Sequence, residues 1–116
     1  MTDAQKRRIA VVASCRDANY IPQVPLAGSV EEGADGITWQ IMHNGIKVLA
    51  YAYYDRSNTE IVKRLCGHHE PQEEKVFHEV LKQIRPGGVM IELGAYWGYY
   101  SLWFHKDIVR ATNYLG

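Results

Sequence analysis

The sequence has no excess of charge of either sign and few cysteines. Its 116 residues include 13 Lys+Arg and 13 Asp+Glu, and three basic residues follow one another only at residues 6–8. It therefore lacks the positive surface that binds nucleic-acid phosphates, and we expect no nucleic-acid partner. Cys15 and Cys66 stand far apart, which gives neither a C-x-x-C zinc motif nor a disulfide framework. A reducing, cytoplasmic compartment is the simplest expectation.

The chain also lacks a hydrophobic run suited to export or to a membrane span. The apolar residues 9–13 that follow the basic residues stop at Ser14, which is too short for a signal-peptide core. Residues 87–104 are nearly uncharged, but Glu92 and four glycines interrupt them, so we expect no membrane segment. With 47% hydrophobic residues, the composition is that of one globular domain rather than a disordered tail.

The first part of the chain divides at about residue 35. Residues 1–35 show little periodicity and contain prolines and glycines, which predicts an irregular arm. Residues 36–53 contain two strand-like runs on either side of Asn44-Gly45. This dipeptide favours a type I′ turn, which needs positive φ at both central residues, so the pattern predicts a β-hairpin.

Two helices are predicted after the hairpin. Ser57 and Glu60 have the spacing of a capping box, and Gly67 supplies a stop, which predicts a short helix. A second helix begins at Pro71 and ends before the Pro-Gly-Gly of residues 86–88. Its apolar residues recur at helical spacing: Val76, Phe77, Val80, Leu81 and Ile84.

The order strand, glycine turn, helix is predicted for the next segment. Residues 89–93 form an apolar run typical of a buried parallel strand, and a helix is expected from Tyr99. Gly94 lets a ligand approach the backbone, the first helical N–H groups face that ligand, and Glu92 can meet a cationic or hydroxyl group. Tyr96 occupies the position of the second glycine in G-x-G-x-x-G, which disfavours a nicotinamide or flavin cofactor but leaves it as an alternative.

The segment VMIELGAYWGYYSLWF, residues 89–104, resembles the first motif of class I S-adenosylmethionine-dependent methyltransferases. With HNGIKVL and GHHEPQEEKVFHEVL upstream, it resembles the FkbM-type branch over residues 36–116. The resemblance implies an α/β, Rossmann-like fold, here its amino-terminal part preceded by the hairpin and helix, with S-adenosylmethionine over the first strands. By resemblance, the cofactor contacts Glu92, Gly94, Ala95, Tyr96 and Gly98, and the preceding helix turns Gln72 and Glu73 toward it.

The resemblance implies methyl transfer to a hydroxyl of a small molecule or glycan. Residues 111–115 look like the start of a second strand, and no ribose-binding acid follows them before Gly116. The sequence therefore predicts the amino-terminal portion of a methyltransferase, weakly active or inactive by itself, with no assigned catalytic base. The alternative is a non-catalytic fragment or interaction module that self-associates through an open sheet edge.

Histidines and aromatic residues have structural interpretations. His69-Glu70 followed by Glu73 narrowly misses the zinc motif H-E-x-x-H, and the positive end of the helix dipole accounts for the acidic residues, so no metal is expected. The aromatic residues between 96 and 104 fit core packing at helical spacing. Isolated histidines are interpreted as surface or packing residues: His43, His78 and His105.

Overall fold

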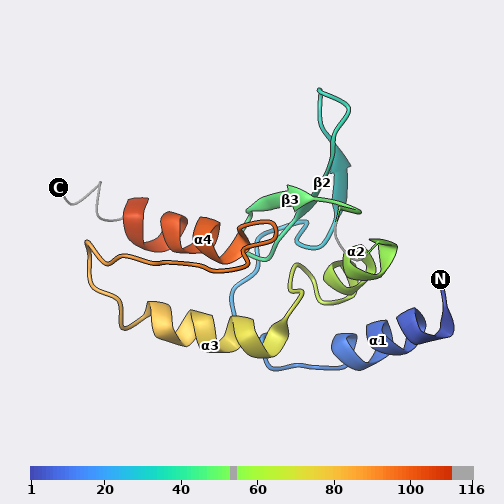
Figure 1. Ribbon diagram of the computed structural model, residues 1–116, viewed down its shortest axis with the longest axis horizontal. Helices are drawn as coiled ribbons and strands as arrows, with labels where there is room; N and C mark the ends of the chain where they lie inside the picture. Colours follow the sequence, from blue (N-terminus) through green and yellow to red (C-terminus); the bar gives the residue numbers. More distant parts are fainter. Residues whose placement is uncertain (53–54, 111–116) are drawn as a thin grey trace.

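The computed structural model describes residues 1–52 and 55–110, which form an α/β domain around a small sheet (Figure 1). The sheet has three antiparallel strands in the order β1-β2-β3. Its strands are β1 (Val30–Glu32), β2 (Thr38–Ile41) and β3 (Lys47–Leu49). The predicted hairpin is therefore confirmed as β2 and β3, and β1 adds a third strand on the other side of β2.

The hairpin connection differs from the predicted type I′ turn. The N–H of Gly45 donates to the carbonyl of Met42 at 3.0 Å, and the N–H of Met42 donates to the carbonyl of Ile46 at 2.8 Å. Gly45 has a φ of +87°, whereas Asn44 is not among the described residues with positive φ. The loop thus has three residues and ends in a left-handed glycine, an arrangement that needs only one residue with positive φ.

The prediction of an irregular arm over residues 1–35 is wrong for α1 (Asp3–Ala13) as well as for β1. Thr2 and Gln5 form a capping box at the start of α1: the Gln5 N–H donates to the Thr2 hydroxyl at 3.1 Å, and the Thr2 N–H donates to the Gln5 side chain at 2.7 Å. The T-x-x-Q spacing is visible in the sequence. Ile9 of α1 is buried against α2.

The helix α2 (Asp55–Arg64) starts before the predicted capping box. Ser57 lies inside the helix, where its hydroxyl accepts a hydrogen bond from Arg8 of α1 at 3.1 Å, so its predicted role as a cap is wrong. The helix ends before Gly67, as predicted. Gln40 of β2 is buried and donates to the carbonyls of Gly28 and Thr59, each at 3.0 Å, which ties the sheet to α2.

The predicted helix after Pro71 is confirmed as α3 (Pro71–Leu81), with proline in the first turn. The helix after the glycine turn is confirmed as α4 (Tyr99–Phe104) and continues as a π-helical turn, η1 (His105–Val109). Trp103 of α4, 2% exposed, belongs to the larger core cluster. The other buried residues of that cluster are Ala18, Ile21, Met42, Val48, Val62, Leu81, Tyr99, Phe104 and Ile108.

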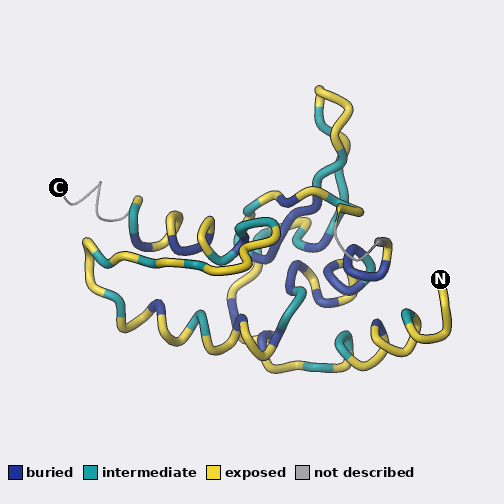
Figure 2. Tube along the Cα trace, in the orientation of Figure 1, coloured by how far each residue is buried: buried dark blue, intermediate teal, exposed yellow. Residues whose placement is uncertain are grey.

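The prediction of a buried parallel strand at residues 89–93 is wrong. These residues are extended but belong to no strand of the described sheet, and they run alongside α4 on the outside of the molecule (Figures 1 and 2). Val89, Ile91 and Leu93 are 87%, 85% and 91% exposed. A β-strand needs a neighbour for its backbone hydrogen bonds, and the described residues place none beside this segment.

The expected parallel sheet is consequently not seen in the described part of the chain, where the sheet is antiparallel. The second strand, expected at 111–115, lies outside the described residues. Across residues 1–52 and 55–110, no helix has both the length and the apolar character required to cross a lipid bilayer.

Candidate functional site

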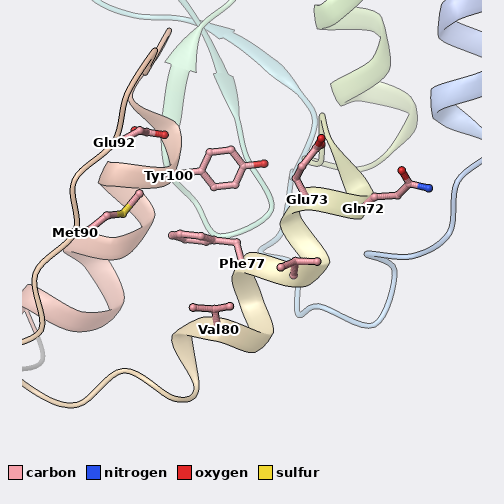
Figure 3. Close-up of a pocket in the computed structure, with 8 residues that line it drawn as sticks. Gln72, Glu73, Phe77, Val80, Met90, Glu92 and Tyr100 are labelled. Atoms are coloured by element: carbon pink, nitrogen blue, oxygen red, sulfur yellow. The ribbon is translucent and has the colours of Figure 1, made fainter.

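An open groove lies between α3 and residues 89–93. Its volume is about 490 Å³ and its walls are almost entirely apolar. Gln72 and Glu73 of α3 line the same groove as Glu92, on the opposite side of Tyr100 in the view of Figure 3, although a helix and a loop separate them in the sequence. The lining residues are Gln72, Glu73, Val76, Phe77, Val80, Met90, Glu92 and Tyr100.

Two aromatic rings stand in the middle of this groove, between the two elements that form its walls (Figure 3). Phe77 and Tyr100 contact each other edge to face, with ring centroids 5.0 Å apart. Behind them, Trp103 packs against Phe77 at 4.9 Å. The rings are therefore anchored in the core, and they give the groove a rigid wall suited to an apolar or planar ligand.

A second cavity, of about 270 Å³, adjoins the groove and is formed largely by the glycine turn. It is lined by Gly94, Ala95 and Tyr96, and it shares Glu92 and Tyr100 with the groove. All of the predicted cofactor-binding residues except one therefore line two adjoining spaces. The exception is Gly98, which lines neither space and precedes the first residue of α4.

The turn itself has an unusual backbone. Gly94, Tyr96 and Gly98 have φ values of +65°, +49° and +70°. A tyrosine in this region costs about 1–2 kcal/mol relative to its preferred conformation, a strain that is common at binding sites. A Cβ atom built on Gly94 would meet no described atom within 4 Å. Gly94 is thus required by its backbone conformation, and the space beside it is open to a ligand.

Polar groups at the edge of the groove are held in place by hydrogen bonds. Glu92 accepts one from the Ser101 hydroxyl at 2.7 Å, and the Tyr100 hydroxyl donates to Glu70 at 3.0 Å. Burial and the charge of Glu70 raise the pKa of Tyr100 well above its usual value, so this phenol remains a hydrogen-bond donor. Loss of hydration beside the groove wall and the neighbouring Glu70 carboxylate also raise the pKa of Glu73, although its side chain is exposed.

A separate cluster of polar side chains lies in the core. Glu74, on the inner face of α3, is fully buried and faces His43 from the hairpin loop and His68 from the loop before α3. Its Oε2 accepts hydrogen bonds from the N–H groups of His69 and Glu70, at 2.9 and 3.0 Å. Its Oε1 lies 3.2 Å from His68 Nδ1 and 3.7 Å from His43 Nε2.

The protonation of this cluster follows from burial and from the neighbouring groups. Burial raises the pKa of Glu74, but the His68 hydrogen bond and the His69 imidazole lower it more, so the net shift is downward. Burial, together with the nearby His68, lowers the pKa of His43 to about 4, and its imidazole is neutral at pH 7. Tyr99 completes the surroundings, since its hydroxyl donates to Glu74 Oε1 at 3.3 Å.

The sequence alone does not indicate this cluster. His43 is an isolated histidine in the sequence, and the helix-dipole explanation of the acidic residues after His69 covers Glu74 as well. One signal was available: Glu74 precedes Phe77 and Leu81 by three and seven residues, which places a carboxylate on the inward face of α3. No local pattern, however, indicates that the hairpin loop returns to this face.

Comparison with known proteins adds no family to this description. No protein-family model, no curated protein and no solved structure matches the chain. The resemblance to FkbM-type methyltransferases therefore stays a prediction from the residues.

Proposed function

We propose that the groove and the adjoining cavity bind S-adenosylmethionine, and that this chain carries the cofactor-binding turn of a Rossmann-like, FkbM-type methyltransferase. The observation that supports the proposal is the convergence of residues from two distant segments. The resemblance assigns Gln72 and Glu73 to the same cofactor site as the glycine turn, and in the structure both residues line the groove together with Glu92. The proposed reaction is methyl transfer to a hydroxyl of a small molecule or glycan.

The chemistry of the lining residues suits this ligand. The molecule has a planar adenine, ribose hydroxyls and cationic ammonium and sulfonium groups. The apolar wall at Phe77 fits the planar ring, and the Glu73 and Glu92 carboxylates fit hydroxyl or cationic groups. The bound cofactor supplies an electrophilic methyl group, while the residues of this chain bind and orient it. We assign no base for the acceptor hydroxyl and expect weak or absent transfer by the chain alone.

The cofactor proposal predicts saturable calorimetric binding of S-adenosylhomocysteine to the purified chain. Glu92→Ala removes a carboxylate shared by both spaces, and we expect it to weaken binding about tenfold, which corresponds to about 1.4 kcal/mol. Glu32→Ala is the matched control, because Glu32 is exposed at the end of β1 and lines neither space.

Circular dichroism of each variant checks that it is folded. A folded chain that takes up no S-adenosylhomocysteine, or one in which Glu32→Ala weakens binding as much as Glu92→Ala, contradicts the proposal. Displacement of the bound ligand by NAD would instead support the nicotinamide alternative, which Tyr96 disfavours on sequence grounds.

A second candidate function is self-association, and the exposure of residues 89–93 favours it. The sequence-based alternative placed association at an open sheet edge. Residues 89–93 form no sheet edge, but they are extended, and Val89, Ile91 and Leu93 are 85–91% exposed, so this segment can pair with a second copy.

This candidate predicts dimers whose fraction rises with concentration in sedimentation experiments. Ile91→Lys should abolish them while changing the free energy of unfolding of the monomer by less than about 0.5 kcal/mol, because the side chain is exposed. Val11→Lys is the control, since Val11 is 71% exposed on α1. A chain that is monomeric at all concentrations, or a large loss of stability in Ile91→Lys, contradicts this candidate.

A further inference from the structure

Three segments of the chain deliver ligand-type side chains to one buried point. His43 comes from the loop between β2 and β3, His68 from the loop after α2, and Glu74 from the first turns of α3. One potential ligand atom of each residue lies within 4.8 Å of the others. Their exposed fractions are 1%, 1% and 0%. Histidine and glutamate in this combination are common ligands of transition metals.

The two imidazoles carry nitrogen atoms that the protein leaves without hydrogen bonds. Among the described residues, neither His43 Nε2 nor His68 Nε2 has a hydrogen-bond partner. His43 Nδ1 lies 3.5 Å from the carbonyl of Pro22, and this contact places the proton of the neutral ring on Nδ1. His43 Nε2 then presents a buried lone pair toward Glu74, an arrangement that costs free energy unless a cation or donor meets it.

The Glu74 carboxylate has the orientation expected of a metal ligand. Its Oε2 is occupied by two backbone N–H groups, which fixes the side chain and leaves Oε1 directed at the imidazoles. Zinc bonds of about 2.0–2.1 Å in tetrahedral geometry separate neighbouring ligand atoms by about 3.3 Å. The distances from Glu74 Oε1 to His68 Nδ1, 3.2 Å, and to His43 Nε2, 3.7 Å, lie on either side of this value.

We propose that His43, His68 and Glu74 form a buried site for a divalent transition metal, with zinc as the preferred ion. Binding at His68 Nδ1 needs the lone pair of that nitrogen, so the proton that the neutral ring donates from Nδ1 to Glu74 moves to Nε2, which has no hydrogen-bond partner among the described residues. The ion would cross-link three elements, namely the hairpin loop, the loop that follows α2, and the helix α3. Its role is therefore structural. The site is independent of the cofactor proposal, because none of the three residues lines the groove or the adjoining cavity.

The test uses the full chain without an affinity tag, stripped with EDTA and then titrated with Co²⁺. We expect one equivalent to bind with the intense visible absorption of tetrahedral cobalt, zinc to displace it, and zinc to raise the thermal midpoint of unfolding. His43→Gln should weaken cobalt binding by about 100-fold or more. His105→Ala is the control, because His105 is exposed and lies outside the cluster.

Unfolding curves in EDTA establish that His43→Gln is folded before its titration is interpreted. His68→Gln provides a second variant that removes a different proposed ligand. The proposal is overturned if the wild-type chain binds no cobalt, or if it binds without the tetrahedral spectrum. It is equally overturned if the two cluster variants bind as tightly as the wild type, or if His105→Ala abolishes binding.

Discussion

Replacing Gly67 by alanine is expected to lower the free energy of unfolding by about 3–5 kcal/mol. Gly67 has a φ of +98°, which side chains rarely adopt. A Cβ atom there would also lie 2.7 Å from His43 Cα and 2.7 Å from the carbonyl carbon of Met42. Both obstacles are backbone atoms, so no side-chain rotation relieves the clash, and the hairpin would have to move away from the loop after α2.

Gly36→Ala is a matched control for this substitution. Gly36 has a similar φ of +79°, but a Cβ atom there would meet no described atom within 4 Å. Its replacement should therefore cost only the conformational penalty, about 1–2 kcal/mol. Urea unfolding in the presence of EDTA measures both changes. Equal losses in the two variants would show that the close approach of Gly67 to the hairpin has no energetic importance.

The same close approach positions the histidine cluster. The N–H of His43 donates to the carbonyl of Gly67 at 3.0 Å, and His68 follows in the chain. The His43 and His68 rings consequently stack with centroids 4.4 Å apart. We expect Gly67→Ala to weaken cobalt binding as well, because it separates two of the three proposed ligands.

Replacing Glu74 by alanine is expected to cost about 3–5 kcal/mol of stability, even without metal. The carboxylate is fully buried and accepts hydrogen bonds from two backbone N–H groups, His68 and the Tyr99 hydroxyl. Its removal leaves these donors unpaired in the core, and each buried unpaired donor costs about 1–3 kcal/mol. It also leaves a cavity beside the imidazoles.

Glu73→Ala is the control, because Glu73 adjoins Glu74 in the sequence but is exposed on α3. We expect this variant to change the unfolding free energy by less than about 0.5 kcal/mol. Thermal and urea unfolding in EDTA separate the contribution of the hydrogen bonds from any contribution of metal. If Glu74→Ala in EDTA were as stable as Glu73→Ala, the buried network would not contribute to folding.

Helices could be predicted from the sequence where residues a few positions apart mark their start and their apolar face. Pro71 and the apolar spacing that follows it define α3, because proline fits the first helical turn and the spacing matches the helical repeat. The Thr2–Gln5 capping box defines α1 equally well, although its short apolar face, centred on Ile9, gave too weak a periodicity for a helix to be predicted. Ser57 shows the opposite error, since capping-box spacing occurs there inside a helix.

The groove could be anticipated in part. Glu92, Gly94, Ala95 and Tyr96 are neighbours in the sequence, so their presence in one site needs only a turn. Their approach to Gln72 depends on how residues 89–93 fold back along α3 and α4. The apolar composition of residues 89–93 predicts a buried strand. Burial, however, requires a neighbouring strand or helix that covers the segment, and the described residues leave Val89, Ile91 and Leu93 exposed.

By itself, the sequence determined the helices after Pro71 and Gly98, the hairpin at Asn44-Gly45 and the turn that carries the proposed cofactor residues. These features rest on interactions between residues a few positions apart. Only the tertiary structure decided that residues 89–93 are exposed and that His43, His68 and Glu74 meet in the core. Such contacts join segments far apart in the chain, and the packing of backbone against backbone at Gly67 brings them together.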